Sequence, residues 1–313
     1  MRPVVGPRTV TRIARRAAVL ALGVLGAACG PAGDATPPVA TVSSPAETDI
    51  WVAELLDSGR RLRVGVPVNA TDRPGYDNQP FFLLDGTGFL YASIDADGQA
   101  DVWRHEFERG RSFRVTRTAE SEFSPTPHAD GTITVVRVEP DGRQRLWRFD
   151  GEGTNPTLVL EHVEPVGYQA WVDAHRVALF VLGEPPTLAS ADVRSGETRP
   201  LLSSIGRSLH AVPGRGTVSV VHKASEDDWR IVEVDLADGE VTTLAPMLRP
   251  AEDYAWLPDG QLIMGRGAKL YLRSPGDDRE WRELADFSTH GILQITRIAV
   301  SPASNRIAFV VQH

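Results

Sequence analysis

One kind of turn recurs along most of this chain at nearly even intervals, and this recurrence limits what the chain can fold into. The turns carry Gly, Pro or Asp and occur in the segments LLDGTGF, PHADGTI, WVDAHRV, AVPGRGT, WLPDGQL and AVSPASN. Successive turns lie 40 to 46 residues apart. Each is followed by an alternating or apolar run rich in β-branched and aromatic residues, and no segment has a convincing 3.6-residue apolar period. The pattern therefore predicts short β-strands rather than helices.

The length of the repeat predicts one all-β architecture. Repeats of about 40 to 45 residues with four short strands are typical of β-propellers, in which each repeat forms one blade. The repeats begin near Gln79, Ser124, Tyr168, Ser208, Asp253 and Arg297. The last repeat has only two strands, and residues 48–65 have the pattern of the strands it lacks. We therefore expect a six-bladed β-propeller over residues 48–313, closed by pairing the N-terminal strands with the last blade.

Several of these segments resemble the repeats of a known family. FSPTPHADGTITVV, AWLPDGQLIM and AVSPASNRIAFV, with DGQADVW and DGRQRLW, are similar to the repeats of TolB-type six-bladed propellers. The resemblance covers most of the chain and weakens in the middle, where Ala174 rather than glycine follows Asp173. It implies a periplasmic or surface-exposed protein that contacts other envelope proteins, often through the mouth of its tunnel. It does not imply catalysis.

Residues 1–28 have the pattern of an export signal peptide. Five arginines and no acid precede a small and apolar run at 17–28, which is too short to span a bilayer as a helix. The only cysteine, Cys29, follows in LGAAC, where a bacterial lipoprotein carries its lipidated cysteine. Gly26 replaces the leucine that is usual three places before it. Ordinary cleavage after a small residue therefore stays open, as does twin-arginine export through Arg15 and Arg16.

The segment 29–47 is rich in Pro, Ala, Thr and Ser and has no apolar periodicity, so it is predicted to be a tether. An acylated Cys29 would hold the folded part near a membrane surface through this tether. Without the five arginines of the signal, 28 basic residues face 41 acidic ones, a formal charge of −13. A body this acidic argues against a nucleic-acid partner, which needs a basic footprint.

The segment SIDADGQADVW raises the question of a metal site. In a helix-loop-helix calcium loop that starts at Asp95, glycine should stand at the sixth position, but Ala100 stands there. A β-hairpin turn at Asp97-Gly98 explains the segment better, because Asp-Gly supplies the positive φ angles of tight turns. Weak calcium binding by Asp95, Asp97 and Asp101 stays as the alternative, and no other metal or cofactor is expected.

Motifs of known catalytic chemistry are absent from the sequence. There is no G-x-S-x-G nucleophile elbow, and the eight histidines are scattered without the H-x-H or H-x-x-x-H spacing of metal ligands. The seven tryptophans fall in or beside strands, where packing between blades explains them better than a sugar-binding platform. An enzyme would therefore need a site assembled from several blades.

A binding site, if present, is expected at the mouth of the central channel, where the innermost strands begin. The residues expected there are Gln79, Ser124, Tyr168, Arg207, Ser208, Asp253 and Arg297. Their neighbours Tyr76, Asp77, Glu122 and Glu252, with Arg207 itself, are expected in the surrounding loops. The mixed charge suits a peptide or a polar ligand, although any solvated ring of loops would show a similar mixture.

Two functions from different classes remain. The first is a non-catalytic, lipid-anchored and monomeric propeller of the cell envelope that binds a protein or peptide partner at its channel face. The second is a propeller enzyme, such as a lyase, a lactonase or a glycan-acting protein, with its site at the channel mouth. Two or three carboxylates or histidines within ~6 Å of one another in the channel, with shifted pKa values, would favour the enzyme.

Overall fold

Antiparallel strands joined by short turns build nearly all of the structure. The computed structural model describes residues 46–57, 59, 61–96 and 98–312, which belong to one compact unit. These residues form 25 strands, no α-helix and a single 3-10 helix, η1 (Ser288–His290). In the same ranges no helix is long and apolar enough to cross a membrane. The predicted signal peptide, Cys29 and nearly all of the tether lie outside the described residues.

Four sheets are antiparallel meanders of four consecutive strands. The first contains β8 (Ser121–Pro127), β9 (Ile133–Val138), β10 (Gln144–Phe149) and β11 (Thr157–Leu158). The second contains β12 (Val166–Trp171), β13 (Arg176–Val181), β14 (Thr187–Asp192) and β15 (Thr198–Ser203). The third contains β16 (Ile205–Ala211), β17 (Thr217–Lys223), β18 (Trp229–Asp235) and β19 (Val241–Pro246). The fourth contains β20 (Tyr254–Trp256), β21 (Leu262–Arg266), β22 (Lys269–Arg273) and β23 (Arg282–Asp286).

The turns predicted from the repeat connect the first two strands of these sheets. Gly131 lies between β8 and β9 with a φ of 82°, and Gly260 lies between β20 and β21 with a φ of 85°. A Cβ atom added at either position would meet no atom within 4 Å. Glycine is therefore favoured here by its left-handed backbone and not by lack of space.

The remaining strands form a nine-stranded sheet that contains both ends of the described chain. Its strands are β1 (Thr48–Asp57), β2 (Leu62–Val64), β3 (Val68–Asn69), β4 (Tyr76–Phe82), β5 (Gly88–Ile94), β6 (Ala100–Glu106), β7 (Arg111–Arg114), β24 (Ile295–Val300) and β25 (Arg306–Gln312). The sheet order is β24-β25-β1-β4-β5-β6-β7, with β2 and β3 also paired to β1. β1 is antiparallel to β25 over seven residue pairs, from Thr48 opposite Gln312 to Glu54 opposite Arg306. It meets β4 only at Thr48 opposite Tyr76.

The hairpin predicted at Asp97-Gly98 is present in this sheet. β5 and β6 pair without interruption from Gly88 opposite Glu106 to Ile94 opposite Ala100. Gly98 has a φ of 77°, and its N–H donates to the Asp95 carbonyl at 2.8 Å. Asp97 itself lies outside the described residues. The SIDADGQADVW segment is thus a strand, a turn and a strand.

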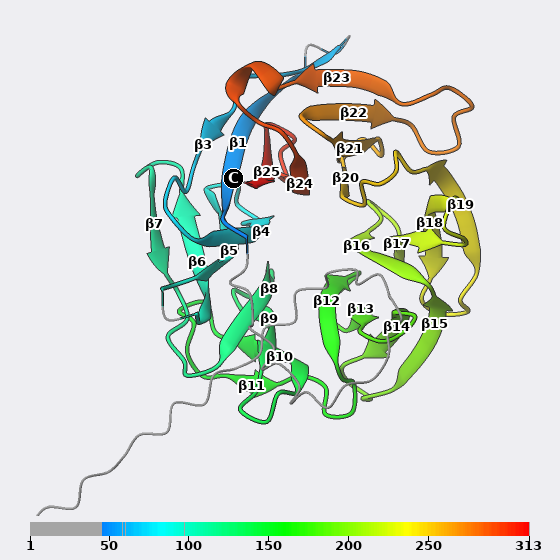
Figure 1. Cartoon of the computed structure of the whole chain (residues 1–313). Coiled ribbons are helices and arrows are strands. Elements are labelled where there is room, and N and C mark those ends of the chain that lie inside the picture. The colour runs from blue at the N-terminus through cyan, green and yellow to red at the C-terminus, as the bar shows by residue number, and fades with distance from the viewer. Residues whose placement is uncertain (1–45, 58, 60, 97, 313) are drawn as a thin grey trace, which may run out of the picture. The chain divides into compact units, whose positions relative to one another are not determined.

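The first strand of each repeat lies on the inside of the unit. Figure 1 shows β4, β8, β12, β16, β20 and β24 nearest the centre, with later strands of each sheet further out. These six strands contact one another in that order, and β24 also contacts β4. Residues far apart in the sequence therefore face one central region.

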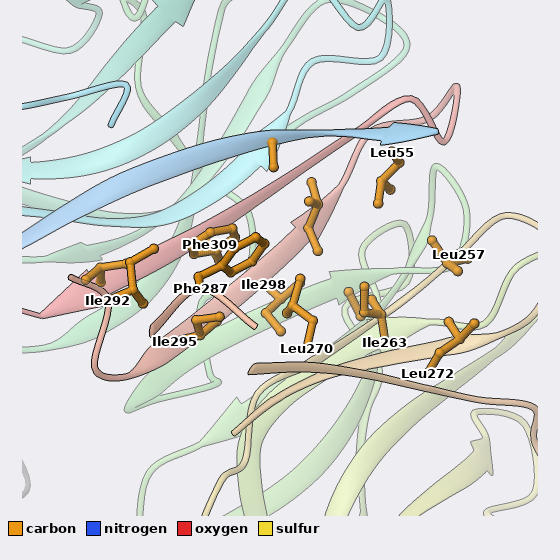
Figure 2. Close-up of a cluster of buried hydrophobic side chains, with 14 residues drawn as sticks. Leu55, Leu257, Ile263, Leu270, Leu272, Phe287, Ile292, Ile295, Ile298 and Phe309 are labelled. Atoms are coloured by element: carbon orange, nitrogen blue, oxygen red, sulfur yellow. The ribbon is translucent and has the colours of Figure 1, made fainter. Parts of the chain in front are cut away.

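Apolar side chains between neighbouring sheets form the core. One cluster lies between the β20–β23 sheet and the β24, β25 and β1 strands, and includes Leu55, Ile263, Leu270, Ile295 and Phe309, all nearly or fully buried (Figure 2). Comparable clusters lie between the other neighbouring sheets. Each sheet buries apolar residues on both faces, as the strongly apolar strands of the sequence require.

The tryptophans pack in or against this core. The sequence favoured this packing role over a sugar-binding platform. Trp281 is a buried member of one cluster, and the other six pack against clusters while partly exposed. Those six are Trp51, Trp103, Trp147, Trp171, Trp229 and Trp256. Their role is to fill the space between sheets.

Candidate functional site

Irregular pairing near the middle of three inner strands turns selected residues toward the centre. The register of β4, β8 and β24 against their partners shifts just around Gln79, Ser124 and Arg297. These residues have φ values of 57°, 51° and 48°. Residues other than glycine rarely adopt this left-handed backbone conformation, which costs each of them on the order of 1–3 kcal/mol. Bulges of this kind re-aim side chains, and here they recur at matching positions of three repeats.

The structure brings all seven residues of the predicted channel mouth around one pocket. They are Gln79, Ser124, Tyr168, Arg207, Ser208, Asp253 and Arg297. The pocket has a volume of about 120 Å³. Its walls come from β4, β8, β12, β16 and β24 and from the residue before β20, so every inner strand position contributes to it.

The expected position of the neighbouring residues in loops is wrong for most of them. Tyr76 and Asp77 belong to β4, Glu122 to β8 and Arg207 to β16. The inner strands begin before the bulges rather than after them, so these residues pair within the sheets. Asp77 and Glu122 have no exposed surface. Only Glu252 lies in a loop, two residues before β20.

The acid of the pocket is held by an arginine. Asp253 is 4% exposed, and its carboxylate accepts hydrogen bonds from Arg207 Nη2 at 2.7 Å and Nε at 3.3 Å. Burial alone would raise the pKa of Asp253, but the charges of Arg207 and Arg297 outweigh it and hold this pKa below its ordinary value. Asp253 is therefore a fixed negative charge at neutral pH.

A second arginine lies against an aromatic ring in the pocket. Arg297 Nη2 donates to the Tyr168 hydroxyl at 2.6 Å, and the guanidinium lies 4.6 Å from the centre of the Tyr168 ring. Burial works against the charge of Arg297, but nearby Tyr168 and Asp253 outweigh it and keep the pKa above its ordinary value. Among the described residues no carboxylate forms a side-chain ion pair with Arg297.

Polar side chains connect the inner strands around the pocket. The Ser124 backbone N–H donates to Gln79 Oε1 at 2.7 Å, which joins β8 to β4. Gln169 Nε2 donates to the Ser124 carbonyl at 2.9 Å, which joins β12 to β8. Trp171 Nε1 and Thr134 Oγ1 each donate to Gln169 Oε1 at 2.8 Å. These bonds fix the pocket wall, so its shape is set before any ligand arrives.

The imidazole in the pocket is poorly suited to proton transfer at neutral pH. His210 Nε2 lies 3.1 Å from Ser208 Oγ, and its ring packs edge-on against Tyr254 with 4.8 Å between ring centres. Burial lowers the pKa of His210 to about 4. Side chains that act as general acids or bases have pKa values near the working pH.

The sequence did not single out the other eight lining residues, among them Phe81, Gln169, His210 and Ile298. Two of them could have been found from strand periodicity, because residues two apart on a strand lie on the same face. Phe81 follows Gln79 and His210 follows Ser208 at that spacing. Phe81 is 41% exposed, which is unusual for phenylalanine and gives the pocket an apolar wall.

A buried carboxylate outside the pocket was also not expected. Glu122 accepts hydrogen bonds from Thr116 Oγ1 at 3.0 Å and from Thr118 Oγ1, and its Oε1 lies 3.3 Å from Arg137 Nε. Arg137 also forms an ion pair with Glu120. Burial raises the pKa of Glu122 to about 7, against the lowering effect of these partners.

The proposed weak calcium ligands face an arginine. Asp101 Oδ2 lies 2.7 Å from Arg114 Nη2, and Asp95 Oδ2 lies 3.8 Å from Arg114 Nη1. Asp97 lies outside the described residues. Within the described ranges no group of three or more His, Cys, Asp or Glu side chains is placed to hold a metal ion.

Comparison with solved structures places the fold among the β-propellers, and TolB structures are among the similar chains. The protein assigned as TolB from Agrobacterium tumefaciens matches 86% of this chain and 99% of its own, with a TM-score of 0.67 and 13% identity. TolB from Acinetobacter baumannii matches 83% of this chain and 63% of its own, with a TM-score of 0.56 and 13% identity. The fold is thus TolB-like, as the repeats suggested.

An enzyme has a similar fold. Oligogalacturonate lyase from Vibrio parahaemolyticus matches 85% of this chain and 98% of its own, with a TM-score of 0.50 and 14% identity. No protein-family model and no curated protein matches the sequence. At these identities the similarity describes the fold alone, and function has to be argued from the pocket.

Proposed function

We propose that this chain is an exported, non-catalytic six-bladed β-propeller that binds a protein or peptide partner at the channel pocket. The observation that carries the proposal is convergence: seven polar or aromatic side chains from all six inner strand positions line one pocket. Preformed polar walls with an exposed aromatic side chain suit recognition of a polypeptide segment. The protein acts as a monomer and needs no cofactor for this role.

The pairing of β1 supports the count of six blades. Divided at the single residue pair of the β1–β4 ladder, the nine-stranded sheet gives one blade of β4–β7 and another of β24, β25, β1 and the short β2 and β3. With the four meanders this makes six. The pairing of β1 with β25 then closes the ring and leaves no free strand edge at the junction.

The pocket holds an acid and an imidazole with shifted pKa values, Asp253 and His210, but the direction of both shifts supports binding over catalysis. The carboxylate of Asp253 is neutralised by Arg207, and its pKa is lowered. The pKa of His210 is about 4. Neither group is tuned to exchange a proton near pH 7, whereas recognition needs only fixed charges and donors.

A propeller lyase, lactonase or glycan-acting enzyme is the second candidate, and the similarity to oligogalacturonate lyase favours it. The test is to incubate the purified protein with oligogalacturonate and follow the unsaturated product by ultraviolet absorbance. We expect no turnover. Turnover that disappears in both Asp253→Asn and Arg297→Gln variants would contradict the non-catalytic proposal.

Envelope localisation and lipid anchoring complete the proposal, and they rest on the export pattern and Cys29. In a detergent phase-separation experiment, we expect the full chain to enter the detergent phase. We expect the Cys29→Ser variant to stay in the aqueous phase, because serine cannot carry the acyl anchor proposed for Cys29. Equal partition of the two proteins into the aqueous phase would contradict the anchor. The pocket proposal would stand in that case.

Partner binding is tested by photo-crosslinking in cells. Phe81 is the best position for the crosslinker, because it lines the pocket and is 41% exposed. Tyr254 is unsuitable because it has no exposed surface. Leu84, which is 52% exposed and does not line the pocket, is the matched control position. We expect one abundant partner that is captured from Phe81 but not from Leu84.

The same experiment includes a variant with Asp253 and Arg297 both changed to alanine. Loss of the captured partner in this variant, with the thermal melt retained, would place the contact in the pocket. Equal capture from both crosslinker positions would contradict a channel-face site.

A further inference from the structure

Two arginines, Arg207 and Arg297, line the pocket. Among the described residues, Arg297 is the one of the two whose side chain forms no ion pair with a carboxylate. The other pocket cation, Arg207, forms a two-point ion pair with Asp253, and its backbone N–H donates to Glu252. Glu252 in turn pairs with Lys223 at 2.5 Å. Among the described residues, the Arg297 guanidinium bonds only to Tyr168, and Asp253 acts on it through its charge without a side-chain ion pair. A partly buried guanidinium of this kind favours a ligand that supplies negative charge.

The orientation of Tyr168 adds a donor at the same place. Its hydroxyl oxygen accepts the hydrogen bond from Arg297 Nη2, so the hydroxyl hydrogen is free to donate elsewhere. A phenol and a planar guanidinium side by side can contact the two oxygens of one carboxylate. The cation also stays over the ring face, which pre-organises it.

The size and walls of the pocket limit the ligand further. At about 120 Å³ the pocket is small against the roughly 300–1,000 Å³ of a typical small-molecule site, so it accommodates one small group of a ligand. Phe81, Leu209 and Ile298 line the pocket beside the charged group, so a short hydrocarbon stem is accommodated as well. A carboxylate on a short stem satisfies both requirements.

We infer that Arg297 and Tyr168 form a carboxylate-binding subsite that takes one carboxyl group of a partner polypeptide. The carboxyl group is either the C-terminus of the partner or the side chain of an Asp or Glu. This inference rests on the proposed partner-binding function and names the group that the pocket recognises.

The test uses three small probes with the purified protein and measures binding by ligand-observed NMR. N-acetyl-leucine has a terminal carboxylate, N-acetyl-leucinamide has the same stem without charge, and N-acetyl-glutamic acid α-amide has only a side-chain carboxylate. We expect an acid to bind at least about tenfold more tightly than N-acetyl-leucinamide. Preference for N-acetyl-leucine points to a C-terminus, and preference for the glutamic acid probe points to an acidic side chain.

Variants connect the binding to the two residues. Arg297→Gln should weaken the acids at least about tenfold, and Tyr168→Phe about fivefold. Gln79 occupies the matching position of the first repeat with a φ of 57°, so glutamine can adopt the backbone conformation of position 297. Arg176→Gln, whose arginine pairs with Asp173 away from the pocket, is the control and should bind as the unchanged protein does.

Several results would overturn the inference. They are equal binding of acid and amide, no binding of either acid, or unchanged binding in Arg297→Gln. If Arg297→Gln fails to fold, unchanged binding in Tyr168→Phe has the same consequence. Crosslinking from Phe81 separates the two proposals: a partner still captured with Arg297→Gln leaves the function in place and rejects the subsite.

Discussion

Asp253 and Glu122 are both buried carboxylates beside an arginine, yet their pKa values move in opposite directions. Asp253 receives two hydrogen bonds from Arg207 and the charge of Arg297, and its pKa is lowered. Glu122 receives two hydroxyl hydrogen bonds and shares Arg137 with Glu120, and its pKa is raised to about 7. Burial opposes the charge in both. The number of cationic contacts per acid decides which effect prevails.

This difference separates the acid of the proposed binding pocket from a buried acid outside it. Asp253 keeps its charge at any physiological pH, so the charge pattern of the pocket is constant. Glu122 changes its charge within the physiological range but has no exposed surface, so its protonation is felt as stability rather than as binding.

The largest expected effect is the pH dependence from Glu122. The folded protein holds the proton of Glu122 up to about pH 7, whereas the unfolded chain releases it near 4.5. Unfolding free energy should therefore fall as pH rises from about 4.5 to 7, by about 3 kcal/mol at about 1.4 kcal/mol per tenfold change in acidity. Urea unfolding of the unchanged protein and of Glu122→Gln at pH 5 and pH 8 measures the difference.

In Glu122→Gln this slope should be reduced, and the variant should be the more stable of the two at pH 8. Asp77 and His105 also have shifted pKa values, but they are common to both proteins and cancel in the comparison. Asp101, whose charge raises the pKa of Glu122, is coupled to the substitution and contributes to the difference. If the unfolding free energy of the two proteins depends on pH in the same way, the raised pKa of Glu122 is contradicted.

Asp253→Asn should have a smaller effect, and its sign at neutral pH should be opposite. It removes a carboxylate that two arginines face, and we expect a loss of about 2 kcal/mol at pH 7, the range for a hydrogen bond to a charged group. The stabilising contribution of Asp253 is present above pH 3.8 and declines as pH falls through its lowered pKa. Denaturant titration at pH 7 measures the loss.

Asp173→Asn is the matched control, because Asp173 and Arg176 form an ion pair in which both side chains are 41% exposed. It should change stability by about 0.5 kcal/mol or less. Equal losses of unfolding free energy in Asp253→Asn and Asp173→Asn would mean that burial of the Asp253–Arg207 pair adds nothing to its stabilising effect.

The smallest expected effect concerns backbone strain in the pocket. Ser124→Gly should relieve the left-handed conformation at a φ of 51° and stabilise the fold by about 0.5 kcal/mol net, because glycine also costs chain entropy. Thr126→Gly, two residues on and outside that conformation, should destabilise by about 1 kcal/mol. Thermal unfolding of both variants is the measurement, and a loss in Ser124→Gly would argue against strain there.

The strands, their meander order and seven of the pocket residues could be predicted from the sequence because they depend on local patterns. Turns at Gly131 and Gly260, alternation along strands and the position of each residue within its repeat are all visible in one chain. Position within the repeat is also what brought Tyr168 and Arg297, 129 residues apart, into one predicted ring.

The backbone conformation of the pocket and the pKa values of the buried acids could not be predicted in this way. Gln79, Ser124 and Arg297 adopt positive φ without the Gly or Asn that would signal it, because neighbouring strands impose the bulge. The strands also begin earlier than expected, which moved Asp77 and Glu122 from loops into buried positions. The pKa of Glu122 depends on Thr116, Thr118 and Arg137, whose arrangement is a product of sheet register.

The pairing of β1 with β25 has a mechanical consequence. Thr48, at the start of β1, lies opposite Gln312 at the end of β25, so a pull on these two residues would load one residue pair at a time and peel the strands apart. A pull between residue 48 and a partner held in the pocket would not separate that pair directly. Tension applied at residue 48 would thus be better resisted when it is carried to such a partner than when it is applied across residues 48 and 312.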